Sequence, residues 1–233
     1  MMNLFCGLLA LIHVFNQEFL MVLVLVFLAV VFDFFDGFFA RKFNVCGSLG
    51  LQLDSLADMV TSGVVPGVVM FVYLKSLLFS QDPLISTEQF SINQLIPYVG
   101  FAITLASAFR LAVFNISTDQ SDEFIGLPTP ANALFIISLP YISRVVEDGV
   151  VKSLLVNPWL LVIVCLLSAY LLNSKLRLFS FKFKNGRPNS LQLSFVVSSF
   201  VLIIFFRLNA LPIIVMGYVF VSFMKFLLGK YFK

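Results

Sequence analysis

Four aspartates lie close together in an otherwise apolar part of this 233-residue chain. Asp33 and Asp36 are three residues apart, and Asp54 and Asp58 are four apart, so each pair shares one face of a helix. Carboxylates are costly in apolar segments, and neighbouring like charges disfavour each other's ionised form. Divalent cations would relieve both effects, and oxygen-only ligands suit Mg²⁺ or Mn²⁺. The pattern therefore predicts a site for two such ions, which could clamp a diphosphate during phosphoryl transfer.

Small residues accompany the aspartates. Gly37 and Gly50 each lie one helical turn from an aspartate, and they remove a side chain beside the predicted ligands. A nucleotide could approach the backbone there, although close packing of helices through small residues is an alternative. Ala40 is small for either reason. Arg41 could reach the phosphates, or it could be an anchor at the inner face of a membrane.

The segments that must position these residues belong to a strongly apolar chain. Hydrophobic residues make up 60% of it, charged residues only 12%, and the mean hydropathy is +1.02. A membrane helix needs about 20 apolar residues, so the length allows about six to eight spans and no soluble catalytic domain. The apolar runs predict an all-α, polytopic membrane bundle with helices at roughly 3–15, 18–41, 47–75, 93–115, 129–146, 157–174, 190–206 and 209–228.

Basic residues are unevenly divided between the two faces of this predicted bundle. With eight spans and both termini inside, eleven lysines and arginines fall on one face and four on the other. Basic residues are retained in the cytoplasm, so we expect the aspartates to lie near the cytoplasmic side. The basic loop 175–187 could also bind anionic lipid headgroups. The small net charge of +3 argues against nucleic acid as a partner.

Other classes of protein could also carry acids in membrane helices. A secondary transporter would couple them to ions or protons, and its two halves would carry charges at corresponding places. Here the four acids lie in the second and third predicted helices, with no counterpart in the C-terminal half. Polar residues that only hold helices together would number one or two rather than four acids in register, and a non-enzymatic assembly protein offers no reason for the regular spacing.

The spacing of eight residues resembles the motif of the CDP-alcohol phosphotransferase family. The matching residues are Asp33, Asp36, Gly37, Ala40, Arg41, Gly50, Asp54 and Asp58. The resemblance implies a homodimeric integral membrane enzyme with a six-helix core, which transfers a phosphatidyl or similar group from a CDP-linked donor to an alcohol and releases CMP. It implies that Asp33, Asp36 and Asp54 ligate the metal ions. It also makes Asp58 the general base, in contact with metal, and makes Gly37, Ala40, Arg41 and Gly50 the residues that bind CDP.

Within the family, further stretches resemble the membrane-embedded phosphatidylserine synthases. They are Asn3 to Gly7, Leu53 to Asp58, Gly63 and Pro66, Arg110-Leu111 with Phe114-Asn115, and Phe124 with Gly126 to Ala131. The sequence departs from that pattern in three places. It lacks the polar lead-in that usually precedes the first helix, has Thr61-Ser62 where Ser-Phe is usual, and has Asn132 where alanine is common.

This closer resemblance implies synthesis of phosphatidylserine and CMP from CDP-diacylglycerol and L-serine in the cytoplasmic membrane of a prokaryote. Glycerol phosphate or inositol phosphate as the acceptor would keep the same chemistry and stays an alternative. We expect one membrane domain over 1–233, with a catalytic core at about 3–180 and two additional helices at about 190–228.

Serine differs from other acceptors in carrying both an ammonium and a carboxylate. Its site therefore needs a fixed cation, and Arg110 near the inner end of the fourth predicted helix could hold a carboxylate in a bidentate pair. Gly126 and Pro128 would give the following loop a fixed, close-lying backbone. These three residues form the predicted acceptor site, unless Arg110 is only a membrane anchor or binds a lipid phosphate.

Overall fold

The computed structural model describes residues 1–43, 47–79, 92–116, 124–174, 177–178 and 190–231. Its helices are α1 (Met2–Phe15), α2 (Phe19–Lys42), α3 (Ser48–Asp58), the π-helix η1 (Met59–Val64), α4 (Val65–Phe79), the 3₁₀-helix η2 (Ile92–Gly100), α5 (Phe101–Ile116), α6 (Thr129–Val145), α7 (Val150–Leu155), α8 (Pro158–Leu172), α9 (Ser190–Phe206), the 3₁₀-helix η3 (Arg207–Ala210) and α10 (Leu211–Tyr231). Two short segments, β1 (Phe124–Ile125) and β2 (Arg177–Leu178), pair antiparallel. The prediction of an all-α fold is confirmed.

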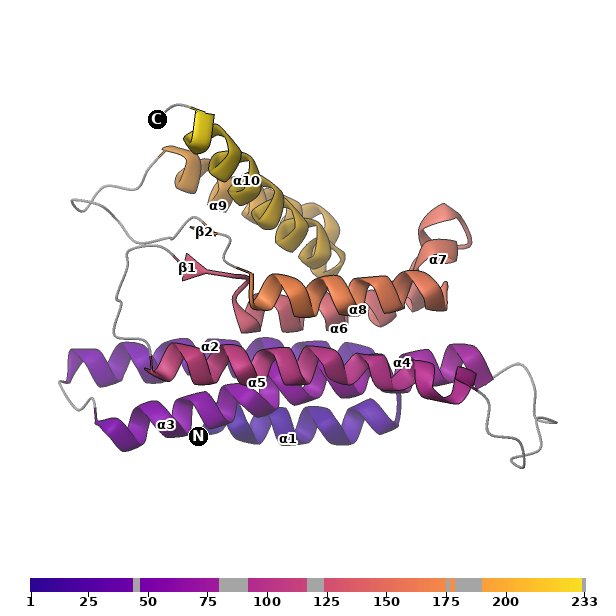
Figure 1. Cartoon of the computed structure of the whole chain (residues 1–233), viewed down its shortest axis with the longest axis horizontal. Coiled ribbons are helices and arrows are strands. Elements are labelled where there is room, and N and C mark those ends of the chain that lie inside the picture. Colours follow the sequence, from indigo (N-terminus) through magenta and orange to yellow (C-terminus); the bar gives the residue numbers. More distant parts are fainter. Residues whose placement is uncertain (44–46, 80–91, 117–123, 175–176, 179–189, 232–233) are drawn as a thin grey trace.

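The helices form three tiers in Figure 1. The lower tier holds α1 to α5, the next holds α6 and α8, and α9 with α10 crosses above them at an angle. The main buried core joins the first two tiers, because α6 packs against both α2 and α4, and α8 packs against α5. Its largest fully buried side chains include Phe19, Leu23, Met70, Ile136 and Leu161.

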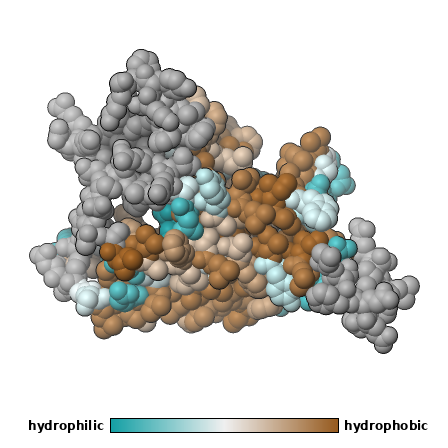
Figure 2. Space-filling model, in the orientation of Figure 1, coloured by the Kyte–Doolittle hydropathy of each residue, from teal (hydrophilic) through white to brown (hydrophobic). Residues whose placement is uncertain are grey.

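Three helical segments in the described part of the chain are long and apolar enough to cross a membrane. They are Phe19–Ala40, Ser48–Phe79 and Asn93–Ile116, and three shorter apolar helices accompany them. Hydrophobic side chains cover most of the coloured surface in Figure 2, and hydrophilic ones gather toward the two ends of the bundle and in one patch beside the grey atoms near the middle. A surface of this kind is suited to lipid, and the chain is a membrane protein.

Two of the predicted helices depart from a regular α-helix. The third runs from Ser48 to Phe79 but contains η1, and the Thr104 hydroxyl donates to the Gly63 carbonyl within it at 2.9 Å. The fourth begins as η2, which contains Pro97. Proline has no N–H to donate, so a regular α-helix is disfavoured there. The short helix α7 was not among the predicted elements.

The turn between α1 and α2 is held by a residue from far along the chain. Gln17 has a positive φ of 57°, which is uncommon for a residue other than glycine. Arg144 at the end of α6 donates to the Gln17 carbonyl at 2.6 Å and to its side-chain oxygen at 2.7 Å. The guanidinium also lies 4.5 Å from the centre of the Phe19 ring. Arg144 thus fixes this turn at the end of the bundle opposite the aspartates.

Candidate active site

Asn3 on α1 joins two of the four aspartates. Its side-chain amide donates to Asp33 Oδ1 at 3.3 Å and to Asp58 Oδ1 at 3.0 Å. Asn3 is only 3% exposed, and its own Oδ1 is a buried oxygen without a hydrogen-bond partner. Sequence reasoning missed this role, although the lone amide at the start of an apolar helix was its signal. Asn3 therefore belongs to the same constellation as the aspartates.

The other two aspartates, Asp54 and Asp36, differ in their contacts. Asp54 and Asp58 both lie near enough to Asp33 for charge repulsion between the carboxylates. Asp36 is exposed and pairs with the amino terminus of Met1 at 3.2 Å. The structure therefore brings Asp33, Asp54 and Asp58 together, whereas Asp36 lies at the rim.

Helix α1 is what brings the two acid-bearing helices into one site. It packs against both α2 and α3, which have little direct contact with each other along their lengths. A side chain at Gly7 would overlap Thr61, so this glycine lets α1 approach η1 closely. Asn3, one turn earlier on α1, is thereby placed at the level of Asp58.

The donor set fits a hard divalent cation in its chemistry. Asp33, Asp54 and Asp58 supply carboxylate oxygens, and the Asn3 Oδ1 adds a buried oxygen that has no other partner. Within the described residues, however, no three acidic, histidine or cysteine side chains form a preassembled ligand group. Asp36 would have to leave the Met1 amine to join them, and exposed ion pairs of that kind are weak.

The residues expected to bind CDP lie on the two acid-bearing helices. Gly37 and Ala40 are half-buried on α2, and Gly50 is exposed on α3. A side chain at Gly50 would meet no described atom within 4 Å, so close helix packing does not explain that glycine. Arg41 continues α2, and its side chain lies outside the described residues.

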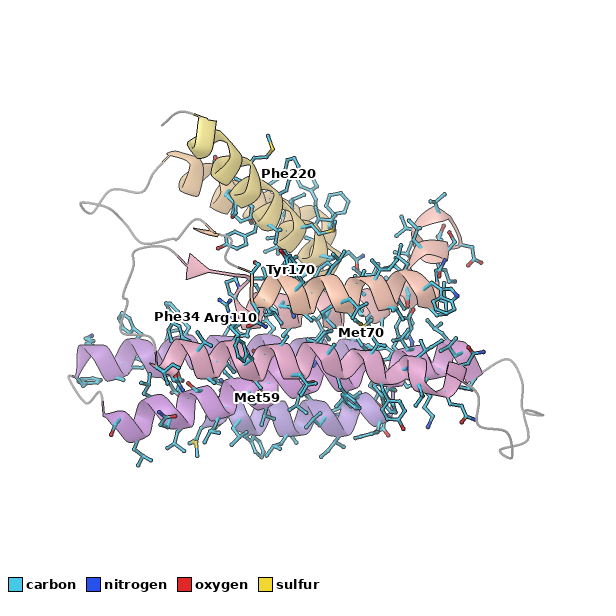
Figure 3. All side chains as sticks on the ribbon, viewed as in Figure 1. Phe34, Met59, Met70, Arg110, Tyr170 and Phe220 are labelled. Atoms are coloured by element: carbon cyan, nitrogen blue, oxygen red, sulfur yellow. The ribbon has the colours of Figure 1, made fainter. Side chains whose placement is uncertain are left out.

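Helix α5 runs antiparallel to α3 and η1. The Ser55 hydroxyl donates to the Asn115 side chain at 2.9 Å, and the Thr104 hydroxyl reaches Gly63. Along the chain, Asp58 lies between Ser55 and Gly63, the two residues that α5 contacts. Arg110 lies between their partners on α5, Thr104 and Asn115. Asp58 and Arg110 are therefore at the same level of the bundle, and Figure 3 shows Arg110 between the lower tier and α8.

Arg110 and Gly126, both expected in the acceptor site, are in direct contact. The guanidinium donates to the Gly126 carbonyl at 3.3 Å and to the Leu172 carbonyl at 2.6 Å. Gly126 has a φ of 73°, and a Cβ there would lie 2.5 Å from both Arg110 Nη1 and the Leu172 oxygen. Only glycine suits this position. Because carbonyls are neutral, these bonds do not cancel the positive charge of Arg110.

Pro128 and Asn132 define how α6 begins. Pro128 occupies the position before the first helical residue, Thr129, and its carbonyl accepts from the Asn132 N–H at 3.0 Å. Asn132 is fully buried, and its side-chain oxygen accepts from the Ser168 hydroxyl at 2.6 Å. The unusual asparagine is therefore explained by a polar contact between α6 and α8.

Comparison with known proteins finds several relatives that carry the same name. A protein of Helicobacter pylori strain J99 is 31% identical over 137 residues, which cover 58% of this chain and 52% of that protein. A Bacillus subtilis protein is 30% identical over 77% of this chain and 86% of its own length, and one from Methanocaldococcus jannaschii is 32% identical over 66% and 63%. All three are named CDP-diacylglycerol–serine O-phosphatidyltransferase. The match spans about half the length of the first of these relatives.

The sequence model of one family matches most of the chain. Its description is CDP-alcohol phosphatidyltransferase, and the matched residues are 1–170. This segment contains Asn3, the four aspartates and Arg110, and it ends within α8. The converging carboxylates, their spacing along the chain and this match agree, and the protein belongs to the CDP-alcohol phosphatidyltransferase family.

Proposed function

We propose that this protein makes phosphatidylserine by transferring the phosphatidyl group of CDP-diacylglycerol to L-serine, with release of CMP. The observation that carries the proposal is the convergence of Asp33, Asp54 and Asp58, two of which Asn3 contacts, in a membrane protein of this family. The names of the relatives favour serine as the acceptor.

At phosphorus, the reaction forms one bond and breaks one, and a proton leaves the serine hydroxyl. The serine hydroxyl oxygen bonds to the phosphorus that carries diacylglycerol, and the bond from that phosphorus to the CMP oxygen breaks. Asp58 takes the hydroxyl proton, and its bond from Asn3 orients the carboxylate for that task. Correct alignment of the two substrates supplies much of the acceleration, because the attack becomes effectively unimolecular.

Asp33, Asp36, Asp54 and Asp58 would hold the divalent ions, Mg²⁺ or Mn²⁺. When bound, the ions would neutralise the carboxylates and the diphosphate of the donor. Gly37, Ala40, Arg41 and Gly50 would contact the CDP part, and the open space at Gly50 supports this assignment.

The proposal also includes the orientation of the protein in the membrane and its oligomeric state. The site faces the cytoplasm of a prokaryote, where CDP enters from water while the diacyl chains stay in lipid. The bundle spans the membrane eight times as a single domain over 1–233, and a homodimer is the functional unit. Crosslinking of the purified protein in lipid nanodiscs tests the dimer, since a monomer-sized product alone would reject it.

One assay separates the candidate functions. The purified protein is incubated with CDP-diacylglycerol and Mn²⁺, with L-serine, glycerol phosphate or inositol phosphate as the acceptor, and CMP is measured. We expect CMP release with serine, its loss on chelation, and its return when Mn²⁺ is restored. Preference for another alcohol would replace serine in the proposal. Release with none of them, in protein that retains its fold, would favour the transporter.

A further inference from the structure

Helix α10 lies outside the segment that the family model matches, yet it contacts the acceptor side of the candidate site. It packs against α6 and against β2. Strand β2 pairs with β1, which directly precedes Gly126. The helix therefore touches α6, which follows the loop of Gly126 and Pro128, and β2, which pairs with the strand that precedes this loop.

Tyr218 is the residue of α10 at the centre of this contact. It is 7% exposed and forms a small core with Leu127, the residue after Gly126. Its ring also lies 6.0 Å from that of Phe195 on α9. The neighbouring Phe220, in contrast, is 64% exposed (Figure 3). The tyrosine thus faces the bundle while the phenylalanine faces outward.

Tyr218 also lies within electrostatic range of Arg110. Arg110 in turn binds the carbonyls of Gly126 and Leu172, and the Leu127 N–H donates to the Leu171 carbonyl at 3.0 Å. These contacts connect α5, the loop before α6, the end of α8 and α10. The electrostatic interaction between Tyr218 and this half-buried guanidinium is suited to fix the direction in which the guanidinium points.

We propose that Tyr218 is a positioning residue for the acceptor alcohol, which acts by holding Arg110 against the loop of Gly126 and Pro128. The C-terminal helix pair then contributes to acceptor affinity and is more than an added membrane anchor. This inference rests on the proposed function in that it takes the Arg110 side as the acceptor site.

The test compares Michaelis constants in four variants. Tyr218→Phe removes the hydroxyl and keeps the ring, so packing with Leu127 is retained. We expect it to raise the KM for serine about tenfold and to leave the KM for CDP-diacylglycerol unchanged. Arg110→Lys should raise the same constant, and the double variant should be no worse than Arg110→Lys alone, because both changes act through one group. Phe220→Leu, on the outward face, is the matched control and should behave as the unmodified protein.

Three results would overturn the inference. They are an unchanged serine KM in Tyr218→Phe, an equal rise in the KM for both substrates, and full additivity in the double variant. The acceptor that the unmodified protein uses distinguishes failure of this inference from failure of the proposed function. If the unmodified protein uses another alcohol in place of serine, the KM values of the variants are measured with that alcohol. These values still decide the role of Tyr218.

Discussion

Asn3 makes the most informative contact at the scale of single residues, because it links α1 to two aspartates on different helices. Groups that orient metal ligands typically change metal affinity by about 10–100-fold when they are removed. We therefore expect Asn3→Ala to weaken Mn²⁺ binding by about tenfold or more, measured by electron paramagnetic resonance of the purified protein. Leu8→Ala, an exposed position on the same helix, is the control. Equal Mn²⁺ affinity in both variants would reject the role of Asn3.

Asp58 has a different predicted role from the other aspartates. Asp58→Asn preserves the size of the side chain and removes the basic oxygen, so turnover should fall about 100-fold or more. Affinity for CDP-diacylglycerol should be largely retained, since a base acts on the acceptor. Single-turnover rates and donor binding, each compared with the exposed-site variant Leu56→Ala, separate the two effects. Near-normal turnover would assign the base elsewhere.

The spacing of the aspartates predicted their grouping, because residues three or four apart share a helix face. It could not predict that Asp36 turns to Met1 or that Asn3 reaches Asp58, which lies 55 residues away. Contacts of that kind depend on how the helices pack. The contacts of Arg110 could not be predicted for the same reason, because one carbonyl partner, Gly126, lies in a loop and the other, Leu172, ends α8.

At the scale of elements, Arg144 fixes the turn between α1 and α2 through two hydrogen bonds and the face of Phe19. Arg144→Leu should lower the free energy of unfolding by about 1–3 kcal/mol, since bonds from a charged donor are lost. Thermal unfolding in detergent measures this. Lys152→Ala serves for comparison, because its pair with the exposed Asp148 should contribute little. A similar melting temperature for both variants would contradict the prediction.

The positions of the long helices could be predicted because membrane helices are apolar runs of nearly fixed length. The interior of those helices could not. The π-helix η1 is associated with Thr104 on a different helix, whose hydroxyl binds the Gly63 carbonyl. The short strands β1 and β2 are two residues each, which is too brief for a period-two pattern.

At the scale of the whole molecule, all the acids of the site lie at one end of the bundle, and Arg144 and Gln17 lie at the other. We expect the aspartate end to face the cytoplasm. In a variant whose native cysteines are replaced by alanine, Ser48→Cys and Asp148→Cys mark the two ends at exposed positions. In intact cells, a membrane-impermeant maleimide should label only Asp148→Cys. Labelling of Ser48→Cys alone would reverse the orientation.

The π-helix that follows Asp58 has a consequence for how this protein tolerates changes in length. A π turn holds one residue more than an α turn, so removing one residue from η1 can restore a regular helix with little rotation of the parts on either side. The same removal from the regular stretch of α4 would turn every later side chain of that helix by about 100°. Single-residue deletions at Met59–Val64 should therefore preserve the packing of the folded protein, whereas deletions a few residues further on should disrupt it. The segment beside the candidate base is thus the one place in this long span where evolution could shorten the chain without repacking the bundle.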